Sequence, residues 1–185
     1  TSQGLELEAR FNPTPSLSLD WGYSLVDSRY RNKLVGAGGK PLTSILFLLP
    51  DSLLSNAPRH SVVMGFSFTP ALTISGLTGL FEVNGRYSSG FNTGSDLLPD
   101  KWQKPFTTLN VNLGLSHRLM GWRMTFWGQN VLNKWYLQTV GSAPLQGSGS
   151  IATVSASPTP TSGNQLFIAF PGEPRTFGVS FKTAF

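Results

Sequence analysis

Carboxylates and guanidinium groups recur at alternate positions along this chain, where they could transfer protons, bind a metal or form ion pairs. Their spacing of two residues puts them on one face of extended segments. Opposite charges that face each other across neighbouring strands stabilise a sheet by about 0.2–1 kcal/mol per pair. We therefore interpret these residues as a salt-bridged polar lining, or alternatively as contacts for a polar solute. The candidates are Glu6, Glu8, Arg10, Glu82, Arg86, Arg123 and Lys182.

The remaining residues that could do chemistry do not form a recognisable catalytic site. His60 and His117 each lie at the end of an alternating segment, beside an arginine, so we interpret them as interfacial polar residues rather than bases or ligands. The chain has no cysteine, which excludes disulfides and thiolate metal sites. We therefore expect no enzymatic activity, no metal site and no bound cofactor.

Seven segments position these residues, and each alternates apolar and polar side chains with the period of two that is typical of a β-strand. In the clearest of them, Leu109, Val111 and Leu113 alternate with Asn110 and Asn112. Because only one face of each segment is apolar, the sequence predicts an all-β, antiparallel fold. The segments cover residues 5–12, 17–25, 61–68, 81–88, 108–116, 122–129 and 175–185.

The connections between the segments alternate in length. Short connections follow the first, third and fifth segments, whereas long ones, at about 27–59, 89–105 and 133–174, follow the others. Transmembrane β-barrels have short periplasmic turns, longer outer loops, aromatic residues at both interfaces and strands of about 9–11 residues. The pattern therefore predicts a transmembrane β-barrel whose last strand ends on the periplasmic side. The alternative is a soluble β-sandwich whose aromatic residues form a core.

Composition argues against other classes of protein. Only 12% of the residues are charged, about half the usual share in soluble domains. The formal charge is +5, but no run of Lys and Arg accompanies it, so we expect no nucleic-acid binding. The longest strongly apolar run, residues 45–49, is too short for a spanning helix. The first residues do not resemble a leader, so we expect any secretory signal to lie upstream or to have been removed.

The number of strands indicates a larger barrel. Single-chain bacterial barrels have an even number of strands, with both ends in the periplasm. If the last of seven strands runs inward, the first also runs inward and Thr1 lies outside. We therefore expect this chain to form part of a larger barrel, either as a fragment or as one subunit of a split barrel.

Four stretches of the chain resemble the C-terminal part of TonB-dependent outer-membrane receptors. They are QGLELE at 3–8, NAPRHS at 56–61, GQNVLNKWY at 128–136 and GEPRTFGV at 172–179. The resemblance covers nearly all of residues 1–185 and implies a barrel of 22 strands, of which these are the last seven. It also implies a plug domain inside the barrel and a TonB box near the N-terminus, neither of which lies in this sequence.

This resemblance implies an energised importer in the outer membrane of a Gram-negative bacterium, for a scarce nutrient such as a ferric siderophore or another small organic solute. The alternative is a passive or structural barrel, a pore or a subunit of a membrane complex, without TonB coupling. An outer-membrane hydrolase would need a Ser/His or carboxylate site that the sequence does not show. In a receptor of the TonB-dependent family, the polar lining would contact the plug domain.

The same resemblance implies several partners for the chain. They are the lipid bilayer, the plug domain, the remaining barrel strands, TonB and the outer-membrane assembly machinery. Four basic residues would lie outside, where lipopolysaccharide phosphates are the nearest anions: Arg29, Arg31, Lys33 and Lys40.

The last strand also resembles the signal by which the assembly machinery recognises its clients. That signal has a polar residue, a glycine two positions later and spaced hydrophobic residues that end in Phe. Here the matching residues are Thr176, Gly178, Phe181 and Phe185. Deletion of Phe185 should therefore impair insertion into the membrane while leaving synthesis intact, and normal insertion of the shortened chain would contradict this assignment.

Overall fold

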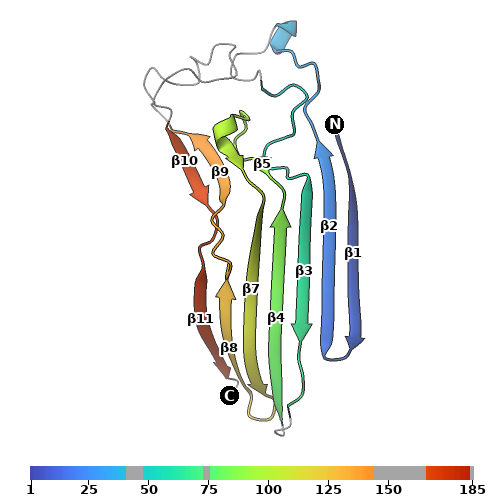
Figure 1. The fold of residues 1–185 in the computed structure, drawn as a ribbon, viewed down its shortest axis with the longest axis vertical. Helices are drawn as coiled ribbons and strands as arrows, with labels where there is room; N and C mark the ends of the chain where they lie inside the picture. Colours follow the sequence, from blue (N-terminus) through green and yellow to red (C-terminus); the bar gives the residue numbers. More distant parts are fainter. Residues whose placement is uncertain (41–47, 73–75, 144–165, 184–185) are drawn as a thin grey trace.

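A computed structural model describes residues 1–40, 48–72, 76–143 and 166–183. In this part of the chain seven long strands form one antiparallel sheet in which sequence neighbours lie side by side (Figure 1). This confirms the predicted all-β, antiparallel fold. The strands are β1 (Ser2–Thr14), β2 (Leu17–Ser28), β3 (His60–Phe68), β4 (Leu77–Ser88), β7 (Phe106–His117), β8 (Trp122–Gln129) and β11 (Thr176–Thr183).

The connections between these strands separate by length onto the two ends of the sheet. The strands joined by the short connections (15–16, 69–76 and 118–121) end where β11 finishes, and those joined by the long connections (29–59, 89–105 and 130–175) end at the opposite side of the sheet (Figure 1). The predicted alternation is therefore confirmed. We refer to the end with the long connections as the outer end.

Two small hairpins stand at the outer end, where the sequence predicted only loops. β5 (Phe91–Asn92) pairs with β6 (Trp102–Gln103), and β9 (Leu137–Ser142) pairs with β10 (Phe167–Pro171). Short three-ten turns, Ala37–Gly39 and Pro99–Lys101, lie in the outer connections. The loop prediction was wrong for these hairpins because the first pair is too short to show periodicity. The second joins segments that lie far apart in the sequence.

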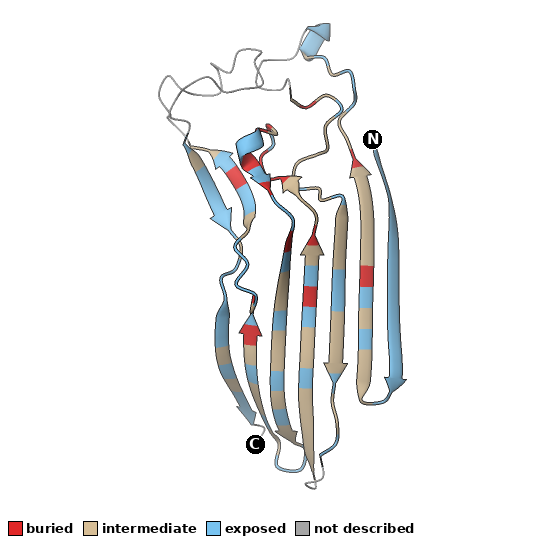
Figure 2. Ribbon diagram, viewed as in Figure 1, coloured by how far each residue is buried: buried red, intermediate tan, exposed pale blue. Residues whose placement is uncertain are grey.

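The register of the strands separates an apolar face from a polar face. Phe66, Val83 and Val111 lie side by side on neighbouring strands of the apolar face. Large apolar side chains on this face stay open to the surroundings, since Leu113 is 50%, Phe126 50% and Phe181 64% exposed. Figure 2 shows that intermediate and exposed residues dominate the long strands.

The few buried apolar residues argue against the soluble alternative. In the described part of the chain they are Leu49, Leu98, Phe106 and Val140, and these do not form a core along the middle of the sheet. A sandwich would bury its apolar face against a second sheet. Such a broad exposed apolar face instead requires a lipid environment. The sandwich prediction is therefore wrong.

The sheet has two edges, β1 and β11, which each pair with one neighbour among the described strands. Lipid cannot satisfy the unpaired backbone groups of an edge, so strands that span a membrane must belong to a closed barrel. No helix in the described residues is long and apolar enough to cross a bilayer.

Candidate functional site

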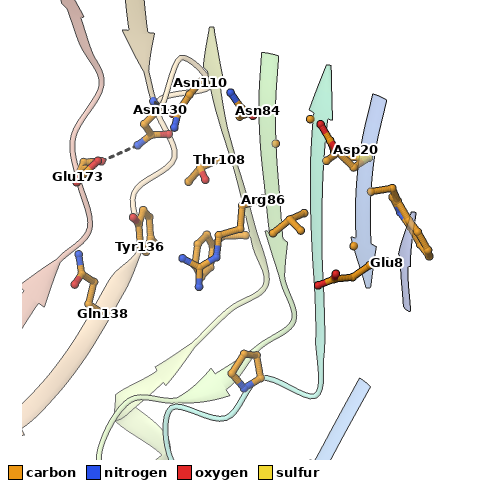
Figure 3. A pocket seen from close by; sticks show the side chains of 18 of the residues that line it. Glu8, Asp20, Asn84, Arg86, Thr108, Asn110, Asn130, Tyr136, Gln138 and Glu173 are labelled. Carbon is orange, nitrogen blue, oxygen red and sulfur yellow. Dashed lines mark hydrogen bonds between the residues drawn. The ribbon is translucent and has the colours of Figure 1, made fainter. Parts of the chain in front are cut away.

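A pocket of about 1180 Å³ lies on the polar face of the sheet, toward its outer end. Strand side chains form one wall, and the segments that cross above β8 and β11 form the other (Figure 3). Because the pocket is on the polar face, that face is the concave, lumen-facing one. The labelled lining residues are Glu8, Asp20, Asn84, Arg86, Thr108, Asn110, Asn130, Tyr136, Gln138 and Glu173.

One ion pair lies in this wall of the pocket. Arg10 faces Asp20 directly across β1 and β2, and its Nε lies 2.5 Å from Asp20 Oδ1. Both side chains are well exposed, so water screens their attraction. The pair therefore fixes the direction of two side chains more than it stabilises the sheet.

Among the described residues no glutamate of the predicted lining forms an ion pair with one of its arginines. The pairing partner of Arg10 is Asp20 rather than a glutamate. Glu8 and Arg86 lie in one row of the lumen face, but Gly22 and Val63 stand between them on the two intervening strands. At a strand spacing of about 4.8 Å, this separates their backbones by roughly 14 Å.

The other predicted lining residues lie outside the pocket. Glu82 accepts a hydrogen bond from Asn112 Nδ2 at 3.1 Å. Glu6 faces Ser24 across the β1–β2 pair. Arg123 and Lys182 face each other across β8 and β11, near the end opposite the outer loops. Like charges in such a pair repel, so these two residues favour an anionic neighbour rather than each other.

Arg86 is the lining residue best suited to bind an anion. It is exposed, projects from β4 into the pocket and forms no ion pair or hydrogen bond with the described residues. Its register neighbours are Val63 and Thr108, neither of which carries a charge. A guanidinium group offers five N–H donors in a planar fork that matches carboxylate or phosphate oxygens.

Asn130 joins the two segments that form the second wall of the pocket. Its Nδ2 donates to the carbonyl oxygens of Lys134 at 2.8 Å and Glu173 at 2.9 Å, and its Oδ1 accepts from Lys134 N at 3.0 Å. The residue is buried and has a positive φ of 45°. Figure 3 shows the bond to Glu173. Asn130 and Glu173 lie in the GQNVLNKWY and GEPRTFGV stretches, which the sequence analysis did not connect with a site.

The residues of the predicted assembly signal lie on both faces of the last strand. Gly178 faces Trp127, and a Cβ at Gly178 would overlap the indole ring, whose Nε1 donates to Ser180 Oγ at 3.2 Å. Phe181 lies on the exposed apolar face and stacks on Trp122 with ring centroids 6.4 Å apart. Thr176 pairs with Gln129 at the start of β11. Phe185 lies outside the described residues. The role of these residues in assembly stays a prediction.

Both histidines lie at strand ends, as expected. His60 begins β3, and its Nδ1 lies 2.9 Å from the hydroxyl oxygen of Tyr23. His117 ends β7, where its Nδ1 accepts a hydrogen bond from Met120 N at 3.1 Å. Within the described residues no three His, Asp or Glu side chains come together in a way that could hold a metal ion.

These features define one wall of a membrane β-barrel, with an apolar outer face and a polar lumen that carries a pocket. The family model described as "TonB dependent receptor-like, beta-barrel" matches residues 1–131. The chain therefore belongs to the TonB-dependent receptor family and contributes part of its barrel. No curated protein matches the sequence significantly.

Solved receptor structures share this fold. The ferric yersiniabactin uptake receptor FyuA from Yersinia pestis is 14% identical and has a TM-score of 0.69, with 100% of this chain and 23% of that chain covered. The siderophore receptor PiuA from Acinetobacter baumannii is 14% identical with a TM-score of 0.62 and coverages of 97% and 21%. The ferric-catecholate import receptor Fiu from E. coli K12 is 17% identical with a TM-score of 0.59 and coverages of 97% and 20%. The chain thus spans about a fifth of the length of these receptors.

Proposed function

We propose that the natural polypeptide carrying these residues is a TonB-dependent importer in the outer membrane of a Gram-negative bacterium. In this proposal residues 1–185 form the last seven strands of a 22-stranded barrel. The scarce nutrient that it imports is a ferric siderophore or another small organic solute. Family membership and the names of the three similar receptors, all of which refer to siderophores or ferric complexes, support this proposal.

The pocket at the outer end is the observation that carries the proposal. An importer needs a concave polar surface that is open to the outside, and residues of the long outer connections, such as Asn56, Phe91 and Tyr136, line this pocket. Arg86 offers an uncompensated cation in its wall. We infer that the solute presents an anionic oxygen group, such as a carboxylate, to Arg86.

The proposal requires partners outside this chain. The edges of β1 and β11 would pair with the remaining barrel strands, and a plug domain would occupy the space in front of the polar face below the pocket. Arg123 and Lys182 would face an acidic part of that plug, which would relieve their mutual repulsion. A TonB box upstream would couple import to energy, and the last strand would be read by the assembly machinery.

Uptake measurements in the native organism test this function. A deletion strain is complemented with the natural polypeptide or its variants, and the uptake of radiolabelled iron complexes is measured with and without a protonophore. We expect the wild type to restore uptake that the protonophore abolishes. Uptake that is restored but resists the protonophore would contradict TonB coupling and favour a passive barrel.

The pocket is tested by Arg86→Gln. Loss of a charge-assisted hydrogen bond should weaken the apparent affinity for the imported anionic complex about tenfold. Arg118→Gln is the matched control, because Arg118 has the same charge but lies in the short connection at the opposite end of the sheet. Equal affinities in the two variants would show that Arg86 does not contact the solute.

A further inference from the structure

Two arginines and one aspartate form a cluster at the outer end of β2 and β3. Arg29 Nε lies 2.7 Å from Asp27 Oδ1, and Arg59 Nη2 lies 3.4 Å from Asp27 Oδ2. Arg29 Nη1 also donates to the carbonyl oxygen of Asp51 at 3.1 Å. One carboxylate therefore holds two guanidinium groups together, and the cluster keeps a net positive charge.

The cluster lies on the outer side of the barrel wall rather than on the lumen side. Asp27 has the same parity along β2 as Leu25 and Tyr23, which belong to the apolar face. The ion pairs with Asp27 then bring Arg29 and Arg59 to this face. The cluster therefore stands apart from the pocket, and neither arginine lines that pocket.

The apolar band of β2 ends immediately below the cluster. Every second residue from Leu17 to Leu25 is apolar or aromatic, and Asp27 is the next residue on that face. From Leu17 to Leu25 the strand advances by eight residues, which at a rise of about 3.3 Å per residue is roughly 26 Å along the strand. With a strand tilt of about 40°, this corresponds to about 20 Å along the membrane normal. This height is close to the roughly 25 Å apolar band of outer-membrane barrels. The neighbouring strand agrees, because the apolar alternation of β1 ends at Leu5, and Gln3, which pairs with Asp27, is the next residue on that face toward the outer end.

A pair of stacked rings lies just below the same boundary. Tyr23 is two residues before Leu25 on β2, and His60 pairs with Leu25. The ring centroids of Tyr23 and His60 are 6.1 Å apart. Amphipathic rings of this kind gather where hydrocarbon meets lipid headgroups. Arg59 directly precedes His60, so the cluster lies at headgroup level.

We propose that Arg29 and Arg59 bind the phosphate of a lipid in the outer leaflet, namely the phosphorylated headgroup of lipopolysaccharide. Guanidinium groups bind phosphate oxygens with paired N–H donors. Each has five such donors, of which the contacts above use two on Arg29 and one on Arg59. Their side chains are 38% and 49% exposed, so a headgroup can reach them. Asp27 positions both groups, while the lipid chains would lie against the apolar band below.

This inference uses the membrane position in the proposed function but does not depend on transport. The test is native mass spectrometry of the purified natural polypeptide, titrated with diphosphorylated lipid A. Lipid A with the same acyl chains but no phosphate separates headgroup binding from chain binding. Inorganic phosphate separates a lipid site from a site for a free anion.

The variant Arg29→Gln/Arg59→Gln should bind diphosphorylated lipid A at least about tenfold more weakly than the wild type. Arg118→Gln, which removes the same charge at the opposite end of the sheet, should bind as the wild type does. Arg29→Lys/Arg59→Lys keeps the charges beside Asp27 but loses the fork geometry, and should give an intermediate affinity. Retained heat-modifiable migration on a denaturing gel shows that each variant is folded.

Three results would overturn the proposal. The first is a folded glutamine or lysine double variant that binds diphosphorylated lipid A as tightly as the wild type. The second is equal binding of lipid A with and without phosphate by the wild type. The third is full competition by inorganic phosphate at millimolar concentration, which would indicate a site for free anions. None of these outcomes depends on whether the polypeptide imports iron.

Discussion

Replacement of Asn130 by alanine should strongly destabilise the barrel wall around the pocket. The substitution removes three side-chain hydrogen bonds and leaves two carbonyl groups and one N–H group without their partner. At about 1 kcal/mol for each bond, the loss is about 3 kcal/mol. Alanine at a positive φ, here 45°, costs about 1 kcal/mol more. We therefore expect Asn130→Ala to lower the free energy of unfolding by about 4 kcal/mol.

Asn133→Ala is the matched control for this prediction. Asn133 also has a positive φ, 52°, but it is exposed, and its side chain makes no hydrogen bond within the described part of the chain. This control should therefore cost only about 1 kcal/mol. The assay is urea unfolding of the natural polypeptide in lipid vesicles, followed by tryptophan fluorescence. A difference below about 1 kcal/mol between the two variants would refute the role of the Asn130 hydrogen bonds.

Three further substitutions test other parts of the wall. Gly178→Val should displace the Trp127 indole and lower the folded, heat-modifiable fraction after assembly. Lys101→Met should leave Asp96 buried without its partner, which lies 2.6 Å away, at a cost of about 3–5 kcal/mol, so proteolysis within residues 89–105 should become at least about tenfold faster. Leu113→Lys should destabilise the folded protein in vesicles by about 2–4 kcal/mol, because Leu113 lies on the lipid-facing side.

Each of these substitutions has a control in the same chain. Gly141→Val should assemble normally, because a Cβ there meets no described atom within 4 Å. Lys104→Met removes the same charge at an exposed position and should leave proteolysis unchanged. Asn112→Lys places the new charge on the lumen face and should cost much less than Leu113→Lys. A control that behaves like its test variant would contradict the corresponding argument.

The sequence alone determined the strands, their two faces and the alternation of short and long connections. Each of these is a local property. A strand between lipid and a polar lumen must alternate apolar and polar residues whatever its neighbours are, and the alternation at Leu109, Val111 and Leu113 showed this before any partner was known. The family resemblance similarly rested on short local stretches.

Only the tertiary structure decided which polar residues meet. The alternation places Glu8, Arg10 and Arg86 on one face, but the register between strands pairs Arg10 with Asp20 and separates Glu8 from Arg86 by two strands. The hydrogen bond from Asn130 to Glu173 and the pairing of β9 with β10 likewise join segments that are distant in the sequence. Register and long-range contacts depend on how turns and neighbouring strands fit together. A period of two therefore predicts a face but does not fix the partner across it.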